Sequence, residues 1–581
     1  MPRSHLTSLR ISSALIDACL KEPYNLNRFL KDVLAGVTVG IISIPLAMAL
    51  AMASGVPPQY GLYTATLGGF IVALTGGSRF SISGPTAAFV VILYPVSKQF
   101  GLGGLLTATF LAGILLIGMA VARLGRLIEY IPGSVTLGFT SGIAVVIATL
   151  QVKDFLGLSL ASQPESYVER VWSLVMAMPT IHWPTVLVAS LTLLVLLIWR
   201  KLNISFPGHL PAILVGTASA MVLSYYGFEV DTIGTRFTYE LPNGLIGQGI
   251  PSQFPSFTWP WKMPGSSGEP IVWSWQTIQA LLPAAFSIAM LGAIESLLCA
   301  VVLDNMTGRR HHANGELLGL GLGNMVVPFF GGIAATAAIA RSVANFKAKA
   351  ESPVSAMIHA LFVLIGLLCL APVLAYLPIA SMAALLVVVA WNIAELHKVI
   401  DLAKKAPLGD ILVLGLCFSL TVLFDMVIAI SVGMVLASFL FMREIARMTR
   451  VSDITMNPKY LQQSISPYWA VYRINGPLFF AAADRIFAEL SQICMEKKGI
   501  ILYFGEVSLI DAGGLSALQR FIDQCRRHQT KVVITDLQFQ PLRTLAKAHI
   551  EAVPGELMFA QTLSELLNQN DESITSKASA A

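Results

Sequence analysis

Charged residues are scarce in this chain of 581 residues, in which Asp, Glu, Lys and Arg together make up 12%. An ordinary soluble domain carries about twice that share. Apolar residues make up 55%, and the mean hydropathy is +0.71. This composition excludes an ordinary soluble protein and predicts an α-helical polytopic protein that lies in a lipid bilayer.

Cysteine is sparse as well, since the six cysteines form no CxxC pair and no metal-ligand spacing. They are typical of small buried hydrophobes. The adjacent His311 and His312 lack carboxylate or thiol partners in the pattern, which favours a solvated loop. We therefore expect no metal and no cofactor. Residues 1–30 lack a long apolar run and a cleavage site, which predicts an uncleaved cytoplasmic segment.

Apolar segments of about the length that crosses a bilayer, roughly 20 residues, recur along the chain. They form two sets of seven, and the third member of each set is short. An odd number of spans inverts the second set relative to the first, as in many secondary transporters. The segments are 33–53, 59–75, 85–97, 103–122, 132–151, 184–199 and 210–227, then 276–301, 315–330, 338–349, 354–375, 379–396, 408–424 and 426–442.

Basic residues test this topology, because cytoplasmic loops carry an excess of Lys and Arg. With the N-terminus inside, the even-numbered gaps are cytoplasmic, and both termini lie in the cytoplasm. The net charge of +5 therefore indicates orientation, and we expect no nucleic-acid partner. The basic residues in those gaps are Arg79, Arg123, Arg126, Arg200, Lys201, Arg309, Arg310, Lys347, Lys349, Lys398, Lys404 and Lys405.

The two short segments share a pattern of extended residues, a Gly, Pro or Thr breaker and a half-length apolar helix. One begins at 81–86, and the other at 331–342 with Arg341 at apparent membrane depth. A guanidinium at that depth faces protein, water or an anion rather than lipid. Because half-helix N-termini offer free N–H groups to anions, the pair predicts an anion site.

After residue 450 the composition becomes that of a soluble α/β domain. Strands are predicted at 469–474, 499–504 and 531–535, and helices at 482–497 and 514–528. The predicted domains are the segment 1–30, a transmembrane domain 31–450, a cytoplasmic domain 451–567 and a disordered tail 568–581.

Several motifs together resemble the sulfate permease (SulP) anion transporters, including their C-terminal STAS domain. The resemblance implies two inverted seven-helix repeats, core and gate domains, an anion between the third and tenth helices, and a homodimer. Among family members the chain is similar to bacterial aerobic C4-dicarboxylate transporters, which implies proton-linked uptake of succinate, fumarate, malate or aspartate across the inner membrane. The motifs lie at 32–49, 58–63, 81–86, 293–296, 314–317, 323–324, 340–342 and 510–515.

Arg341 is the first candidate for substrate, because a guanidinium can meet a carboxylate or sulfate with two parallel hydrogen bonds. Glu295 is the clearest intramembrane acid, and the family pattern implies proton coupling there. The alternative for both is a fixed ion pair between Arg341 and Glu295 that only stabilises the protein, and Arg341 could also be held by backbone carbonyls without touching substrate.

Backbone N–H groups and hydroxyls complete the predicted anion site. Thr86 and Ala87 begin the first half-helix, Thr336 and Ser342 lie opposite, and Ser43 lies in the first span. For each hydroxyl the alternative is a bond to its own helix.

The STAS-like loop contains Asp511 and Gly513. Ala512 and Gly513 stand where anti-sigma-factor antagonists carry Ser-Ser, so phosphorylation is not expected there. Folding, dimer contact or a cytoplasmic protein partner remain as roles for this domain.

Three functions therefore stay open. The first is a proton-coupled anion symporter that works by alternating access and takes C4-dicarboxylates, with sulfate or bicarbonate as alternative substrates. The second is an uncoupled anion exchanger or channel, and the third is a membrane-anchored sensor.

Overall fold

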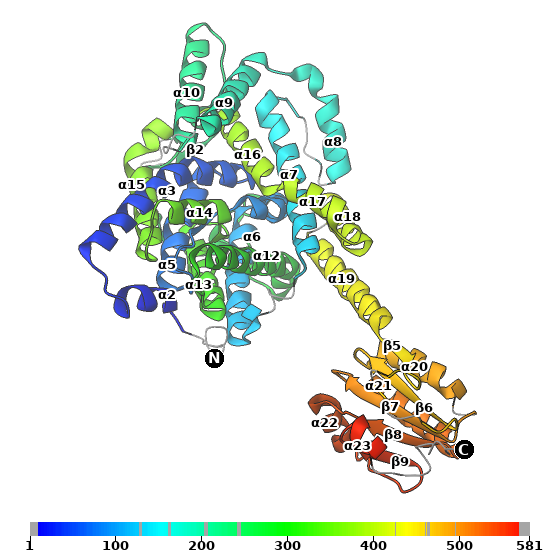
Figure 1. Cartoon of the computed structure of the whole chain (residues 1–581). Helices are drawn as coiled ribbons and strands as arrows, with labels where there is room; N and C mark the ends of the chain where they lie inside the picture. The colour runs from blue at the N-terminus through cyan, green and yellow to red at the C-terminus, as the bar shows by residue number, and fades with distance from the viewer. Residues whose placement is uncertain are drawn as a thin grey trace, which may run out of the picture. The chain divides into compact units, whose positions relative to one another are not determined.

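The computed structural model describes residues 10–126, 131–160, 164, 166–202, 207–240, 246–424, 426–458, 460–461, 465–493 and 496–568 (Figure 1). The chain forms two compact units, Met1–Met434 and Val435–Ala581. The division falls inside helix α19 (Met426–Met448), upstream of the predicted boundary at residue 450. Except for Asn568, which ends a helix, the predicted disordered tail lies outside the described residues.

The first unit is helical, and its elements follow the order of the predicted spans. Before the central loop come η1 (Ile16–Leu20), η2 (Thr64–Gly68) and the helices α2 (Ser13–Leu15), α3 (Leu26–Ala53), α4 (Pro58–Tyr63), α5 (Gly69–Thr75), α6 (Ala87–Val121), α7 (Gly133–Leu156), α8 (Tyr167–Met176), α9 (Trp183–Lys201) and α10 (His209–Tyr225). After it come α12 (Trp275–Thr307), α13 (Ala313–Val326), α14 (Ile339–Lys347), α15 (Val354–Leu374), α16 (Ile379–Ile393), α17 (Leu396–Lys405), α18 (Leu408–Leu423) and α19.

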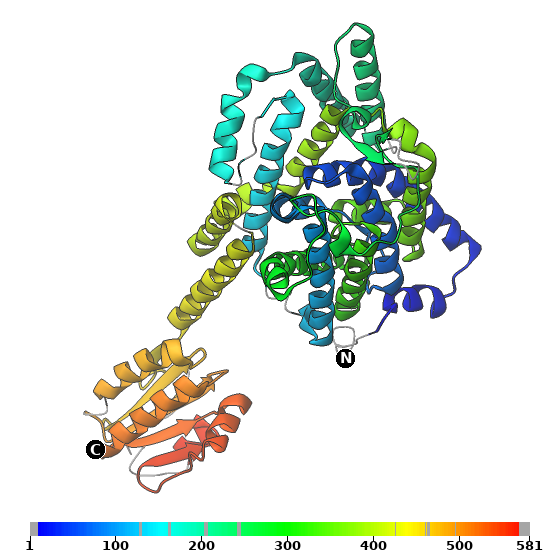
Figure 2. The same ribbon diagram turned by 180° about the vertical axis from the view of Figure 1, so that it is seen from behind.

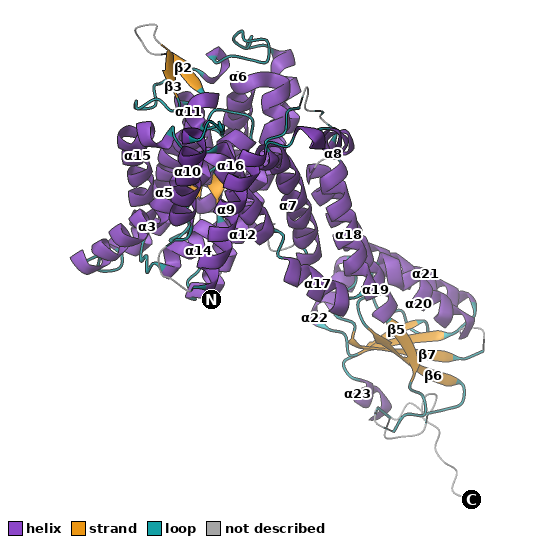
Figure 3. Ribbon diagram, turned by 90° about the horizontal axis from the view of Figure 1, so that it is seen from above, coloured by secondary structure: helices purple, strands orange, loops and turns teal. Residues whose placement is uncertain are grey.

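Among the described residues, eight helical stretches are long and apolar enough to cross a membrane. The predicted segments 85–97 and 103–122 both lie within the range of α6, where they form two helices that meet at a kink, as predicted. They are separated only by a break at Gly101, whose φ of 70° and ψ of −171° lie where glycine alone is comfortable. The central loop carries α11 (Ile233–Arg236) and the hairpin of β2 (Thr238–Glu240) and β3 (Ile246–Gln248) (Figure 3).

The helices of the first unit pack in two groups, which are the core and gate domains of this fold. In the core, α3 packs on α15, and α6 packs on both α12 and α13; in the gate, α7 packs on α16 and α18, and α9 on α10. Each group thus contains helices from equivalent positions in the first and the second set of apolar segments. Figure 2 shows blue N-terminal helices beside green helices from the second set. Small residues allow the close contacts, as a Cβ on Gly40 would lie 2.5 Å from the Phe362 ring.

The second unit is an α/β domain, as predicted. Its sheet has the order β5-β6-β7-β8-β9, with β5 antiparallel to β6 and the other pairs parallel. The strands are β5 (Arg450–Asp453), β6 (Trp469–Asn475), β7 (Gly499–Glu506), β8 (Lys531–Thr535) and β9 (Leu557–Ala560), and the helices are α20 (Phe480–Ile493), α21 (Ala512–Arg527), α22 (Phe539–Lys547) and α23 (Leu563–Asn568).

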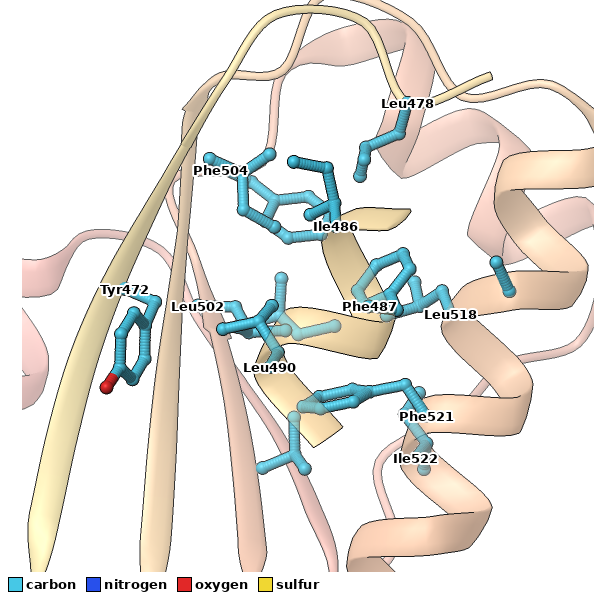
Figure 4. Close-up of a cluster of buried hydrophobic side chains, with 14 of the residues drawn as sticks. Tyr472, Leu478, Ile486, Phe487, Leu490, Leu502, Phe504, Leu518, Phe521 and Ile522 are labelled. Atoms are coloured by element: carbon cyan, nitrogen blue, oxygen red, sulfur yellow. The ribbon is translucent and has the colours of Figure 1, made fainter. Parts of the chain in front are cut away.

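Alternate strand residues point to opposite faces of this sheet. Tyr472 and Leu502 face a core that contains Phe487 of α20 and Phe521 of α21 (Figure 4). The neighbouring Val471, Ile501 and Val533 pack instead against α23 and the 454–465 segment. Both faces of the sheet are therefore covered by apolar side chains from this unit.

Candidate anion site

The extended residues ahead of the two half-helices pair with each other. Strand β1 (Ser83–Gly84) lies antiparallel to β4 (Thr336–Ala337), with Gly84 opposite Thr336. Helix α6 begins three residues after β1, and α14 begins two residues after β4. The pairing therefore brings together two helix N-termini from segments about 250 residues apart, whose N–H groups and dipoles favour an anion.

Neither half-helix uses a side chain to cap itself. Thr86 and Ala338 are the N-cap residues of α6 and α14, and neither makes a side-chain capping hydrogen bond. Thr86 and Ala87 are both buried, at 5% exposure. The first-turn N–H groups are thus not claimed by the side chains that usually satisfy them.

Side chains from two other elements, α13 and η2, hold the chain just before β4 in place. The Asn324 amide on α13 both donates to and accepts from the backbone of Ala335, at 2.8 Å in each case. The Thr64 hydroxyl donates to the Ile333 carbonyl at 3.0 Å. These bonds satisfy backbone groups that the short strands leave unpaired.

Two of the predicted substrate hydroxyls also take part in this scaffold. Thr336 donates to the Gly292 carbonyl at 3.0 Å, and Ser342 accepts from the Ile82 N–H at 2.9 Å. Both side chains are fully buried. In this structure they bond to backbone, and their contact with substrate stays a prediction.

Arg341 lies at the β1–β4 pair, as the pattern of the two segments predicts. Its side chain is buried at 2% exposure, and Nη2 donates to the Pro85 carbonyl at 2.5 Å. Its Nε and Nη1 have no hydrogen-bond partner among the described residues. A Cβ on Gly84 would lie 3.0 Å from Nη1, so the missing side chain makes room for the guanidinium.

Glu295 reaches the same place from α12. Its Oε2 accepts a hydrogen bond from the Thr86 hydroxyl at 2.9 Å. Within the described part of the chain no hydrogen bond joins Glu295 to Arg341. The structure thus brings an acid, a base and two helix N-termini together without a direct bond between acid and base.

Ser43 is the one predicted site residue on α3. It is fully buried, and its hydroxyl has no partner among the residues described. A buried hydroxyl without a partner is unusual in a native structure, so it is free to bond to a guest molecule.

The regulatory-loop candidates have structural contacts in the second unit. Asp511 caps α21, because its Oδ1 accepts from the Gly514 N–H at 2.7 Å while Oδ2 accepts from the Phe480 N–H at 3.2 Å. A Cβ on Gly513 would lie 2.6 Å from the Phe480 Cβ. The loop is therefore fixed against the start of α20, and a regulatory role stays a prediction.

The interpretation of the histidine pair as lacking carboxylate partners is wrong. His311 Nδ1 lies 2.8 Å from an Asp304 oxygen, and His312 Nε2 lies 2.8 Å from an Asp17 oxygen. Asp17 belongs to the N-terminal segment, and such a distant partner leaves no trace in local spacing. Over the described ranges no group of three His, Cys, Asp or Glu side chains is placed to hold a metal ion.

Two buried residues near the site, Gly84 and His359, were not among the predicted site residues. Gly84 belongs to the motif at 81–86, but its need to be glycine depends on the side chain of Arg341, which lies far along the chain. His359 is 1% exposed in the middle of α15. A titratable residue within an apolar span is itself a signal of function, so this residue could have been found.

Comparisons with known proteins agree with this architecture. The model of the sulfate permease family matches residues 29–415, and that of the STAS domain matches residues 460–565. A Bacillus subtilis (strain 168) protein named "Putative sulfate transporter YvdB" is 39% identical over 526 residues, which cover 90% of this chain and 94% of the relative. The "Bicarbonate transporter BicA" of Picosynechococcus sp. is 27% identical over 540 residues, covering 89% and 90%.

Solved structures share the fold. The murine Solute Carrier 26 family member A9 anion transporter, in its inward-facing state, superposes with a TM-score of 0.80 at 18% identity and covers 96% of this chain and 94% of its own. The transmembrane domain of a cyanobacterium bicarbonate transporter, BicA, gives a TM-score of 0.57 at 25% identity, with 71% of this chain and 98% of that chain covered.

Proposed function

Because the chain belongs to the sulfate permease family of anion transporters, we propose that it imports doubly charged small anions by proton symport and alternating access. The observation that carries this proposal is the β1–β4 pair, which brings two half-helix N-termini together beside Arg341. The Nε and Nη1 of Arg341 have no hydrogen-bond partner among the described residues. Such a constellation complements the oxygens of a carboxylate or sulfate.

C4-dicarboxylates such as succinate, fumarate, malate and aspartate are the first candidate substrates, in line with the resemblance of the sequence motifs. Sulfate is the second candidate, because the relative that is 39% identical is named as a sulfate transporter. Sulfate, succinate, fumarate and malate carry two negative charges at neutral pH, and aspartate carries two carboxylates with one net negative charge. Each can accept two parallel hydrogen bonds from a guanidinium. Bicarbonate carries one charge and ranks after them.

Glu295 carries the coupling proton in this proposal. Its carboxyl lies at the N-cap of α6, where the Thr86 hydroxyl reaches it. A carboxyl there is ionised most easily when the positive helix end and Arg341 lack an anion. Arrival of an anion favours the protonated acid, so anion and proton cross together. Exchange or channel activity without protons is the competing mechanism.

The remaining expectations belong to the same proposal. We place the chain in the bacterial inner membrane with both termini in the cytoplasm, as a homodimer whose STAS domain contacts a cytoplasmic protein. The excess of basic residues in the even-numbered gaps supports this orientation.

The test is uptake of radiolabelled succinate and sulfate into proteoliposomes under an inward proton gradient. We expect Arg341→Ala to lose uptake and Glu295→Gln to transport without response to the gradient. Glu395→Gln is the matched acid control, because Glu395 pairs with Lys398 on an exposed helix start. Gradient-driven uptake in Glu295→Gln contradicts the coupling role, and no uptake of any anion by the native chain favours the sensor function.

A further inference from the structure

His359 lies on the face of α15 that meets α14. Residues four apart share a helix face, so Asn345 lies beside Arg341 on α14, and Ser355 beside His359 on α15. The Asn345 amide donates to the Ser355 hydroxyl at 2.9 Å. A Cβ on Gly69 would lie 2.8 Å from the carbonyl oxygen of Ser83 in β1 and 4.0 Å from the Cβ of Ala360, the residue after His359. This part of α15 therefore lies beside the β1–β4 pair, the place where Arg341 also lies.

The polar atoms on this side of the guanidinium lack partners. His359 is 1% exposed, and neither Nδ1 nor Nε2 has a hydrogen-bond partner among the described residues. The same holds for Nε and Nη1 of Arg341. A neutral imidazole has one donor and one acceptor, and leaving either of them unpaired in the interior is unfavourable. Neighbouring unpaired donors of this kind call for a guest with several acceptor oxygens.

From this juxtaposition we propose that His359 is a proton-carrying second ligand that makes the Arg341 site selective for doubly charged oxyanions. This proposal rests on the proposed transport function. In the empty site the ring stays neutral, because a second positive charge beside Arg341 is unfavourable in a low dielectric. A doubly charged anion neutralises the positive charge of Arg341 and retains one negative charge, which favours protonation of the His359 ring.

The step is a simple proton transfer. A hydronium ion in the water on the side from which the anion enters supplies the proton: one of its O–H bonds breaks and leaves a water molecule, one N–H bond forms on the imidazole, and that N–H donates to the bound anion. A singly charged anion is already neutralised by Arg341 and takes up no proton. His359 therefore selects the valence of the anion, whereas Glu295 carries the coupling proton.

Few other charges bear on this ring. From α12, Glu295 acts on Arg341 and accepts from Thr86. The packed segments η2 and α5 contain no titratable residue. The titratable residues of the other elements packed on α15 are Arg28, Lys31 and Asp32 of α3, which contact residues 351–352 about two turns before His359, and Tyr60 and Tyr63 of α4.

Equilibrium binding of radiolabelled sulfate and nitrate to the purified full-length protein tests the proposal, from about pH 5.5 to about pH 7.5, the range in which histidine titrates. Sulfate keeps two charges and nitrate one throughout. Glu295 takes up its proton with either anion, so we expect native affinity for sulfate to fall more steeply with pH than that for nitrate, by up to about a further tenfold per pH unit, the limit for one linked proton. In His359→Gln and His359→Asn the sulfate slope should fall to the nitrate slope.

His209→Gln is the matched control, since His209 lies at the start of α10 and also has a ring nitrogen without a partner among the described residues. It should keep the native pH profile. The proposal is overturned if His359→Gln keeps the native slope, or if it weakens sulfate and nitrate equally at every pH, as a structural role predicts. If the native protein binds sulfate and nitrate with the same pH dependence, only this proposal fails. If it binds neither anion nor succinate, the proposed function fails as well.

Discussion

At the scale of single residues, the proposed anion site depends on the guanidinium of Arg341, which donates to the Pro85 carbonyl while Nε and Nη1 have no partner in the described part of the chain. We expect Arg341→Ala to raise the KM for anion uptake about 10- to 150-fold, because a charge-assisted hydrogen bond contributes about 1.5–3 kcal/mol. The KM of Arg341→Lys should lie between those of the native protein and Arg341→Ala, because lysine keeps the charge but lacks the planar guanidinium with its parallel donors. Saturation kinetics in proteoliposomes measure this.

Arg236→Ala is the control for that series, because Arg236 pairs with Asp154 at a partly exposed position outside the site. Its KM should equal that of the native chain. An unchanged KM in Arg341→Ala means that the guanidinium supports the fold without touching substrate.

Gly84 offers a subtler change at the same site. A methyl group there meets Nη1 at 3.0 Å, so Gly84→Ala should push the guanidinium away from its present place. Overpacking of this kind costs about 1–3 kcal/mol, and we expect anion affinity to fall about fivefold or more. Gly118→Ala in α6 is the control, because a Cβ on Gly118 meets nothing within 4 Å, and this variant should bind normally. Equal binding by both variants contradicts the assigned role of Gly84.

Local sequence identified some of these residues and not others. Arg341, Thr86 and Glu295 are polar groups in apolar runs, and the structure brings them to one place. The partners that hold the site, such as Asn324 and Gly84, act on residues distant in the sequence or in a different element. A single sequence does not indicate which distant side chain occupies the space that a glycine leaves open.

At the scale of elements, the N-terminal segment ahead of α3 is tied to the core domain by charges. Glu22 contacts Arg28, Arg79 and Arg309, and Asp17 contacts Lys21 and His312. A cavity of about 250 Å³ lies among these side chains and the end of α12. The sequence predicted only a polar segment here, because ion pairs between distant loops have no local signature.

This arrangement predicts a pH-dependent stability. Burial of Asp17 raises its pKa, but hydrogen bonds from Lys21 and His312 outweigh that effect and leave the pKa lowered. A carboxylate with a lowered pKa stabilises the fold above its unfolded pKa, near 3.9, and this contribution is lost as the pH falls through the folded value. Thermal unfolding of native protein and Asp17→Asn should therefore differ at neutral pH and converge below about pH 3.

The size of the effect is modest, since partly exposed ion pairs contribute about 0–1 kcal/mol. Asp401→Asn serves as a control, because Asp401 pairs with Lys405 while its side chain is 62% exposed. It should change the melting temperature little at any pH. A difference between native protein and Asp17→Asn that grows below pH 3 contradicts the assigned sign.

At the scale of the whole molecule, hydrophobic periodicity and length predicted most of the fold. The two sets of apolar segments, the short third member in each and the change to an α/β domain all have counterparts in the structure. The grouping into core and gate follows from the family resemblance rather than from periodicity. The boundary between segments 85–97 and 103–122 is confirmed as well, because the non-helical backbone of Gly101 separates two helices within α6.

The end of α19 belongs energetically to the α/β domain, although composition suggests a boundary at residue 450. The Arg485 Nη2 on α20 donates to the carbonyls of Ala446 and Thr449 at 2.9 and 2.7 Å. A fragment of residues 440–568 should therefore be more stable than one of residues 451–568, by about 1–3 kcal/mol for two hydrogen bonds to a charged group. Urea unfolding of both fragments measures the difference.

Arg485→Ala tests the cause of that difference. With the guanidinium removed, the longer fragment should lose most of its advantage, while Phe521→Ala should destabilise both fragments equally, by about 3–5 kcal/mol, because Phe521 lies in the core that both contain. If the two fragments are equally stable with Arg485 present, residues 440–450 act only as a tether and the domain begins at the predicted boundary. If the advantage survives Arg485→Ala, the pairing of β5 with β6 carries it instead, because a fragment that begins at 451 lacks the first β5 residue, Arg450, which pairs with Asn475.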